Sequence, residues 1–237
     1  MPDYTAIMLK KYGQPLVYKA INPLVNLLVK YKISPNTITT IGLVINIGAA
    51  VVFIVGAETA PRENLSYVGW AGALILFGGL FDMIDGHLAR VAGMSSTYGA
   101  LYDSVLDRWS EIIMFFGVSY FLISHHYFLS SMFVFFALTG SVMVSYTRAR
   151  AEGLGIDCSV GIMQRPERVI IVGVSATICG MVSGEIGGDY KFYSETLDMV
   201  LFETISILTT PILIVAILAN YTAIERLSHS RKVLKGK

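Results

Sequence analysis

Residues Thr37 to Gly56 read TITTIGLVINIGAAVVFIVG, a run without a single charged side chain. An α-helix of about 20 mostly apolar residues crosses the hydrocarbon core of a bilayer. This run therefore predicts a transmembrane helix, and with it a membrane protein rather than a water-soluble domain.

The composition of the whole chain agrees with that prediction. Hydrophobic residues make up 54% of the 237 residues and charged residues only 15%, whereas soluble domains carry about 25% charged residues. Such a chain is too apolar to stay disordered in water. Its net charge of +1 gives the chain as a whole no preference for acidic or basic partners, so no nucleic-acid partner is expected.

Six stretches of the chain are long and apolar enough to span a bilayer. Only short polar breaks separate them, which leaves no room for a separate soluble domain. The predicted fold is an all-α membrane protein, with one six-helix domain over residues 37–226 and a basic tail over 227–237. The predicted spans are 38–57, 67–88, 99–124, 127–147, 167–184 and 199–224.

Residues 1–36 form a separate N-terminal segment. Between Val17 and Tyr31, apolar side chains recur at helical spacing and polar side chains take the opposite face. This pattern predicts an amphipathic helix at the membrane interface, although a short helix packed on the bundle explains it equally well. The apolar positions are Val17, Ile21, Leu24, Leu27 and Leu28, and the polar ones are Lys19, Asn22, Asn26 and Lys30.

The distribution of basic residues predicts the orientation. With six spans, both termini lie on the same side, and most of the 18 Lys and Arg residues fall on that side. Arg62 and Lys191 fall on the other side, and Arg108 lies within a span. Because basic residues concentrate on the cytoplasmic side, we expect a multi-pass protein of the cell membrane with both termini in the cytoplasm.

Four aspartates stand where the second predicted span ends and the third begins. Asp82 and Asp85 are three residues apart, and Asp103 and Asp107 are four apart, so each pair shares one helix face. The connection Gly86–Tyr98 is short, which predicts that the two helices are antiparallel neighbours. The four carboxylates then converge just inside the cytoplasmic boundary, where ionisable groups indicate a functional site.

Four like charges need a neutralising partner in such a site. Protonation is one solution and a divalent cation is the other, and oxygen-only ligands favour Mg²⁺, Mn²⁺ or Ca²⁺. Gly86 and Gly99 leave room for a ligand beside the carboxylates. A pair of metal ions in this place suits phosphoryl or pyrophosphoryl chemistry. His87 is expected to be a loop residue rather than a metal ligand.

These residues together resemble a known signature. The pattern Asp82-x-x-Asp85-Gly86-x-x-Ala89-Arg90, then Gly99-x-x-x-Asp103-x-x-x-Asp107, is similar at all eight fixed positions to that of the CDP-alcohol phosphotransferase family. The resemblance implies an enzyme of six transmembrane helices with an interfacial N-terminal helix, usually a homodimer. Such enzymes transfer a phosphatidyl-type group from a CDP-linked lipid to an alcohol and release CMP.

The resemblance also implies roles for the matching residues. Asp82, Asp85, Asp103 and Asp107 would bind two ions of Mg²⁺ or Mn²⁺, and Asp107 would also act as the general base. Gly86, Ala89, Arg90 and Gly99 would shape the pocket for the CDP-lipid, together with Asp82 and Asp85. Ser34-Pro35-Asn36-Thr37-Ile38-Thr39 resembles the family's entry to the first span, which would place Asn36 and Thr39 near the nucleotide; a plain helix cap explains the same motif.

A second region is more selective for the acceptor alcohol. The stretches Ser145 to Gly155 and Gly161 to Ile170 are similar to those of bacterial phosphatidylinositol-phosphate synthases and archaeal archaetidylinositol-phosphate synthases. Their acceptor is inositol 1-phosphate, and arginines suit its phosphate. The resemblance implies Arg148 and Arg168 as phosphate ligands, with Arg226 as a third. Arg150 and Arg165 are explained by topology alone.

Two other functions fit part of the sequence. Glycerol 3-phosphate is also a phosphate monoester and would use the same arginines as acceptor. A cation transporter also carries intramembrane carboxylates, but here the four acids gather at one membrane edge and the chain shows no internal repeat. CMP formation separates the enzyme from the transporter.

Overall fold

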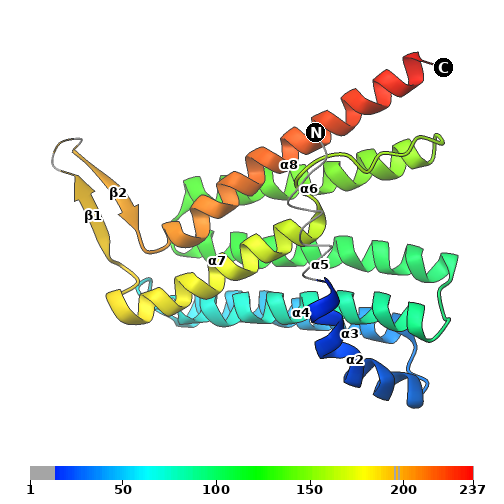
Figure 1. Ribbon diagram of the computed structural model, residues 1–237. Coiled ribbons are helices and arrows are strands. Elements are labelled where there is room, and N and C mark those ends of the chain that lie inside the picture. The colour runs from blue at the N-terminus through cyan, green and yellow to red at the C-terminus, as the bar shows by residue number, and fades with distance from the viewer. Residues whose placement is uncertain (1–13, 195, 197, 237) are drawn as a thin grey trace.

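The computed structural model describes residues 14–194, 196 and 198–236, so residues 1–13 of the predicted N-terminal segment lie outside it. Figure 1 shows long helices running in roughly one direction, with a shorter helix at an angle to them and a hairpin projecting at the opposite end. The elements are α2 (Gln14–Lys30), α3 (Pro35–Thr59), α4 (Ser66–Val91), α5 (Thr97–Ser124), α6 (Phe128–Glu152), α7 (Arg165–Ile186), β1 (Lys191–Ser194), β2 (Met199–Glu203) and α8 (Ser206–Lys235).

Within the described ranges, five helices are long and apolar enough to cross a membrane: α3, α4, α6, α7 and α8. The protein is therefore a multi-pass membrane protein. Helix α5 is just as long, but its first half carries charged side chains at Asp103, Asp107, Arg108 and Glu111. Many large apolar side chains on the outer faces of the helices are exposed, as lipid-facing positions are.

Small residues allow the helices to approach closely. A Cβ on Gly69 would lie 2.9 Å from Gly180 Cα, and one on Gly72 would lie 2.5 Å from the Thr177 backbone nitrogen, so α4 and α7 pack backbone to backbone. Gly117 of α5 meets Ala50 of α3 in the same way. Close packing of small residues is the usual means of helix association in membranes.

Helix α3 packs against both α4 and α5 and lies between them. Our prediction that α4 and α5 are direct neighbours is therefore wrong, because α3 packs extensively on each of them and they hardly contact one another. Tyr102 of α5 instead shares a hydrogen bond of 2.9 Å with Thr40 of α3. The two pairs of aspartates face each other across the end of α3, close to its N-terminus.

Helix α2 uses part of its apolar face to pack on the bundle. Val25 is fully buried in a cluster with Ile38, Ile84 and Leu88, and its neighbours Ile21 and Leu28 are partly buried against the same cluster. Leu24 and Leu27 are 45% and 49% exposed. The side chain of Val17 lies outside the described part. Packing on the bundle therefore accounts for one strip of the amphipathic pattern, and a second apolar strip stays free.

The last predicted span begins in the wrong place. Met199–Glu203 is not helical but forms an antiparallel hairpin with Lys191–Ser194, with Phe192 opposite Phe202. The hairpin is a departure from the all-α prediction, and the aromatic and β-branched residues of both strands favour it. Arg62 binds Glu203 at 3.2 Å and so ties the hairpin to the rest of the chain. Helix α8 continues to Lys235, so most of the predicted basic tail is helical.

Candidate active site

The signature residues occupy the facing ends of α4 and α5. Helix α4 continues to Val91, and Gly93 follows with a positive φ of 64°. The predicted connection Gly86–Tyr98 is therefore mostly helical, and His87 lies in α4 rather than in a loop. Ser96 then caps α5 by accepting a hydrogen bond of 3.0 Å from the Gly99 backbone N–H. These two helix ends present the aspartates toward one another.

A cavity of about 230 Å³ lies between the start of α3 and the facing ends of α4 and α5. Ser34 caps α3 by accepting from the Thr37 backbone N–H at 3.2 Å, so the cap interpretation of the entry motif is correct. The same motif also brings Asn36 and Thr39 to the cavity wall. The other predicted residues that line it are Asp85, Gly86, Ala89, Arg90, Gly99 and Asp103.

Both signature glycines matter to this cavity, in different ways. A Cβ on Gly99 would lie 3.0 Å from Ser96 Oγ and 3.5 Å from Asn36 Oδ1, so a larger residue would disturb the cap and the cavity wall. A Cβ on Gly86 would meet no atom of the described residues within 4 Å and would point into open space. Replacing Gly86 by a larger residue would therefore occupy cavity volume that is available to a ligand.

A second cavity, of about 710 Å³, adjoins the first and shares Gly86, Arg90 and Asp103 with it. Asp82 and Asp107 line its polar part. Its remaining wall is apolar and comes from α4 and α7, with Leu76, Phe77, Leu80, Val169 and Ile170. One cavity thus combines carboxylates with an apolar surface, which suits an amphiphilic ligand.

A third cavity, of about 510 Å³, adjoins the second through Asp107 and Arg165. Cationic side chains dominate its wall, and they come from four helices: Arg108, Arg148, Arg165, Arg168 and Arg226. All thirteen residues that the sequence assigned to the site line one of these three adjoining cavities, and Asp107 stands where the second and third meet.

Arg165 lies among the aspartates themselves. Its Nη1 atom is 2.6 Å from Asp82 Oδ2 and 2.9 Å from Asp107 Oδ1, and its side chain is only 13% exposed. Topology alone, our sequence-based explanation for Arg165, does not account for this position. The sequence carries no signal that brings the start of α7 beside the ends of α4 and α5, since that contact depends on the tertiary fold.

Arg168 and Glu111 form a buried ion pair below this cluster. Arg168 Nε donates to Glu111 Oε1 at 2.6 Å and Nη2 donates to Oε2 at 3.0 Å, while Nη1 donates to the Met163 carbonyl at 2.9 Å. Arg168 is fully buried and Glu111 is 3% exposed. Glu111 was missed in the sequence, although it follows Asp107 by four residues and so continues the acidic face of α5.

The other two arginines assigned to the acceptor, Arg148 and Arg226, differ in exposure and in hydrogen bonding. Arg226 is 2% exposed and donates to the carbonyls of Val160 at 2.8 Å and Val144 at 2.7 Å. It thereby fastens the segment after α6 to α6 and α8. The Arg148 side chain is 46% exposed and pairs with Glu152 at 2.8 Å. Arg148 is accordingly free to change partner, whereas Arg226 is fixed.

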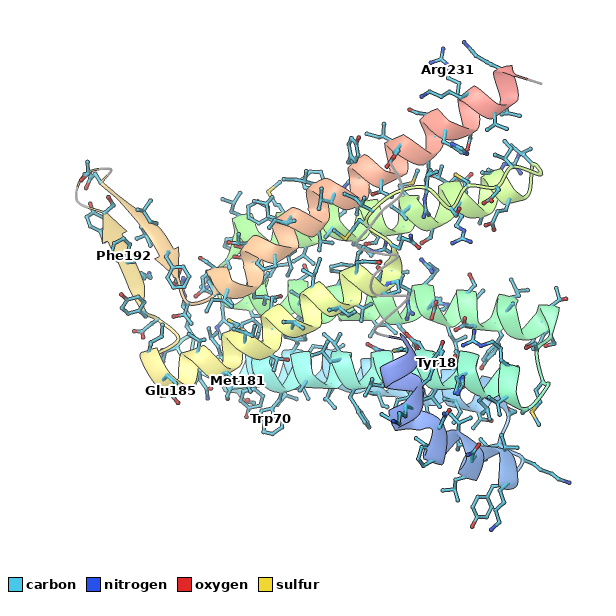
Figure 2. The ribbon with its side chains drawn as sticks, viewed as in Figure 1. Tyr18, Trp70, Met181, Glu185, Phe192 and Arg231 are labelled. Atoms are coloured by element: carbon cyan, nitrogen blue, oxygen red, sulfur yellow. The ribbon has the colours of Figure 1, made fainter. Side chains whose placement is uncertain are left out.

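Helix α2 reaches the site through Tyr18. The Tyr18 hydroxyl accepts a hydrogen bond of 2.7 Å from Arg90 Nη2, and its ring stacks on His87 at 4.3 Å between centroids. Asn22 Oδ1 lies 2.7 Å from His87 Nε2. Figure 2 shows Tyr18 where α2 crosses the bundle. These contacts fix Arg90, a residue of the signature, at the edge of the first two cavities.

Comparison with known proteins identifies the family. Residues 32–201 match the sequence pattern of CDP-alcohol phosphatidyltransferases, which is well over half of the chain. The chain belongs to the CDP-alcohol phosphatidyltransferase family. Archaetidylinositol phosphate synthase from Methanothermobacter thermautotrophicus is 28% identical over 235 residues, covering 99% of this chain and 100% of that one. Phosphatidylinositol phosphate synthase from Streptomyces avermitilis is 31% identical over 183 residues, covering 76% of this chain and 71% of that one.

Solved structures of a third relative have the same fold. The crystal structure of phosphatidylinositol phosphate synthase from Mycobacterium tuberculosis with CDP-DAG bound matches with a TM-score of 0.67 and 25% sequence identity, over 88% of this chain and 92% of that one. A structure of the same protein in complex with manganese and citrate matches with a TM-score of 0.70 and 24% identity, over 88% and 87%. The fold of this family member is therefore that of a membrane phosphatidyltransferase.

The carboxylates of this family member are arranged more loosely than a formed metal site. In the part of the chain that the structure describes, no three His, Cys, Asp or Glu side chains lie close enough to hold a metal ion. Arg165 occupies the space between Asp82 and Asp107 instead. Asp85 Oδ2 is buried and has no hydrogen-bond partner among the residues that the structure describes. A buried unpaired carboxylate oxygen is costly, so this atom and the oxygen-only donor set fit a hard divalent cation.

Proposed function

We propose that this protein transfers a phosphatidyl-type group from a CDP-linked lipid, CDP-diacylglycerol or CDP-archaeol, to inositol 1-phosphate, with release of CMP. One observation carries the proposal: the cavity that combines the carboxylates with an apolar wall adjoins a cavity lined by five arginines, and Asp107 lines both. The named relatives, synthases of phosphatidylinositol phosphate and archaetidylinositol phosphate, support the same acceptor.

The proposed setting is the cytoplasmic side of the cell membrane. In it α5 is the sixth span, and α2 lies at the interface with its free strip, Leu24 and Leu27, toward lipid. The site then opens at the cytoplasmic boundary, because the ends of α4 and α6 and the starts of α5 and α7 all lie there. The same proposal includes one membrane domain over residues 37–226, preceded by the N-terminal segment 1–36 and followed by the tail 227–237. It also includes assembly as a homodimer.

The CDP-lipid occupies the first two cavities in this proposal. Asn36, Thr39 and Gly99 adjoin the nucleotide, and the open space beside Gly86 admits the diphosphate near Arg90. The tails follow the apolar wall of the second cavity between α4 and α7. This placement uses every residue that the signature assigns to the donor, including Asp82, Asp85 and Ala89.

Asp82, Asp85, Asp103 and Asp107 are the residues that would hold Mg²⁺ or Mn²⁺, two ions in our proposal. Bound metal stabilises charge on the phosphates and on the leaving group. Asp107 takes the proton from the acceptor hydroxyl, whose oxygen then forms a bond to the lipid-bearing phosphorus. The bond from that phosphorus to the CMP oxygen breaks, and CMP leaves with the electron pair.

The acceptor phosphate binds in the third cavity in this proposal. Arg148, Arg168 and Arg226 line it, and Arg165 joins them at the boundary with the second cavity. Arg168 donates three of its N–H groups to Glu111 and Met163, which leaves two of the five donors of a guanidinium group for a ligand. Arginine clusters bind phosphate monoesters through paired, charge-assisted hydrogen bonds.

The acceptor is tested by measuring CMP release from CDP-diacylglycerol and CDP-archaeol with a panel of alcohols. We expect activity with inositol 1-phosphate and at least about tenfold less kcat/KM with glycerol 3-phosphate, since one or two lost hydrogen bonds to a polyol cost about 1.4 kcal/mol or more. Free inositol and serine lack the phosphate and serve as controls. Greater activity with glycerol 3-phosphate would assign that alcohol, and activity with free inositol alone would contradict the phosphate site.

Replacing Arg165 by Gln is expected to tighten binding of Mn²⁺ by about tenfold. The guanidinium group stands 2.6 and 2.9 Å from two of the carboxylates, and a cation so close competes with a metal ion for them. Isothermal titration calorimetry on the purified protein measures the affinity without turnover. Arg165→Lys keeps the charge and should bind Mn²⁺ as the parent does. Unchanged or weaker binding in Arg165→Gln would show that Arg165 does not compete for the metal.

A further inference from the structure

A groove separate from the active site lies between the C-terminal halves of α6 and α8. It has a volume of about 620 Å³ and shares no lining residue with the three cavities described above. Its walls are largely apolar, and two of the residues that form them, Ile224 and Leu227, are 63% and 65% exposed. A volume of this size is within the range of small-molecule binding sites.

The polar end of this groove carries only positive charge. Arg150, Arg231 and Lys235 line it, and no carboxylate of the described residues does. Among the described residues none of these three cations forms an ion pair, unlike Arg148, which lies two residues before Arg150 and pairs with Glu152. Three cations that form no ion pair with any described residue, gathered at one end of an apolar groove, are complementary to an anionic amphiphile.

The position of the cations agrees with such a ligand. Arg150 lies in the last turn of α6, and Arg231 lies near the end of α8, where Figure 2 shows it. Both ends are on the same side of the protein as the active site, so the cations stand at the membrane boundary. Met143 and Asn220 line the groove farther along the same helices, toward the middle of the bilayer. A lipid headgroup would therefore lie beside the cations at the membrane boundary, and its hydrocarbon chain would lie along the apolar walls toward the middle of the bilayer.

We propose that this groove binds an anionic phospholipid. Its phosphate lies among Arg150, Arg231 and Lys235, and one of its chains follows Ile224 and Leu227. The occupant is a lipid other than the substrate in transfer, because the groove lies outside the three catalytic cavities. Basic residues near a membrane surface are attracted to anionic lipid headgroups, so three of them favour an anionic lipid over a zwitterionic one.

Brominated lipids test the proposal in the full-length protein. Tyr146 lines the groove and is 60% exposed, so Tyr146→Trp places a fluorophore there without touching the active site. We expect brominated phosphatidylglycerol to quench the added Trp signal at least about fivefold more effectively than brominated phosphatidylcholine. Adding Arg150→Gln, Arg231→Gln and Lys235→Gln should bring the ratio of the two quenching constants to about one.

A charge-matched control separates this groove from general attraction to the membrane. Lys30→Gln, Lys32→Gln and Lys232→Gln remove the same net charge from residues that do not line the groove, and the ratio should then stay near that of the Tyr146→Trp parent. An equal fall of the ratio in the control overturns the proposal. So does a ratio of one in the parent, or a signal from the introduced tryptophan that neither lipid quenches because a second copy of the chain covers the groove.

Discussion

Replacing Asp107 by Asn should reduce CMP release by about 10²- to 10⁴-fold, because the acceptor hydroxyl loses the group that we propose as its general base. Asn has nearly the same size, and its side-chain oxygen still accepts from Arg165 Nη1, which lies 2.9 Å from Asp107 Oδ1. The fold and the donor cavity should therefore remain intact. The loss should appear in kcat with inositol 1-phosphate as acceptor, and CDP-lipid binding, measured separately by titration, should stay within about threefold of the parent.

The matched control for this variant is Asp189→Asn. Asp189 is an exposed aspartate beyond the end of α7, at the end of the molecule opposite the active site. The same chemical change there should leave CMP release unchanged. Near-normal turnover in Asp107→Asn would refute the assignment of Asp107 as the base, whereas a lost thermal transition would instead show that the carboxylate stabilises the fold.

The sequence predicted the local parts of this site because they depend on spacing along single helices. Asp82 and Asp85 share one face of α4 and Asp103 and Asp107 one face of α5, and these relations follow from helical geometry alone. The apolar runs predicted α3, α4, α6 and α7 for the same reason. In each case the local sequence alone determines the feature, without contacts to distant segments of the chain.

The parts that could not be predicted depend on contacts between distant segments. The sequence explains Arg165 by topology alone, because it does not reveal that α7 packs on α4. That packing brings Arg165 to Asp82 and Asp107. The apolar residues of β2 predict the start of a span, because only their pairing with β1 distinguishes them from those of a helix. A short apolar run does not distinguish strand from helix without its partner.

Arg168 was assigned to the acceptor from its sequence context, and its buried pair with Glu111 suggests a second, structural role. Replacing Arg168 by Met leaves the buried Glu111 carboxylate, among the described residues, with only the more distant Arg108, whose Nη1 lies 3.7 Å from Glu111 Oε2. The removal of one member of a buried ion pair costs about 3–5 kcal/mol. We expect Arg168→Met to lower the thermal unfolding temperature of the detergent-solubilised protein more than any other single arginine substitution in the third cavity. Arg148→Met, which removes an exposed partner of Glu152, should shift it little, since exposed pairs contribute about 0–1 kcal/mol.

The double variant Arg168→Met with Glu111→Leu separates the structural role from binding. It replaces both charges by apolar side chains of similar size, and such replacements are often neutral or stabilising, so the unfolding temperature should recover to near that of the parent. KM for inositol 1-phosphate should nevertheless remain raised, because the cavity has lost one of its arginines. KM for the CDP-lipid should not change, since Arg168 does not line either donor cavity. Recovery of both stability and acceptor KM would show that Arg168 serves only to neutralise Glu111, and the phosphate would then depend on Arg148, Arg165 and Arg226.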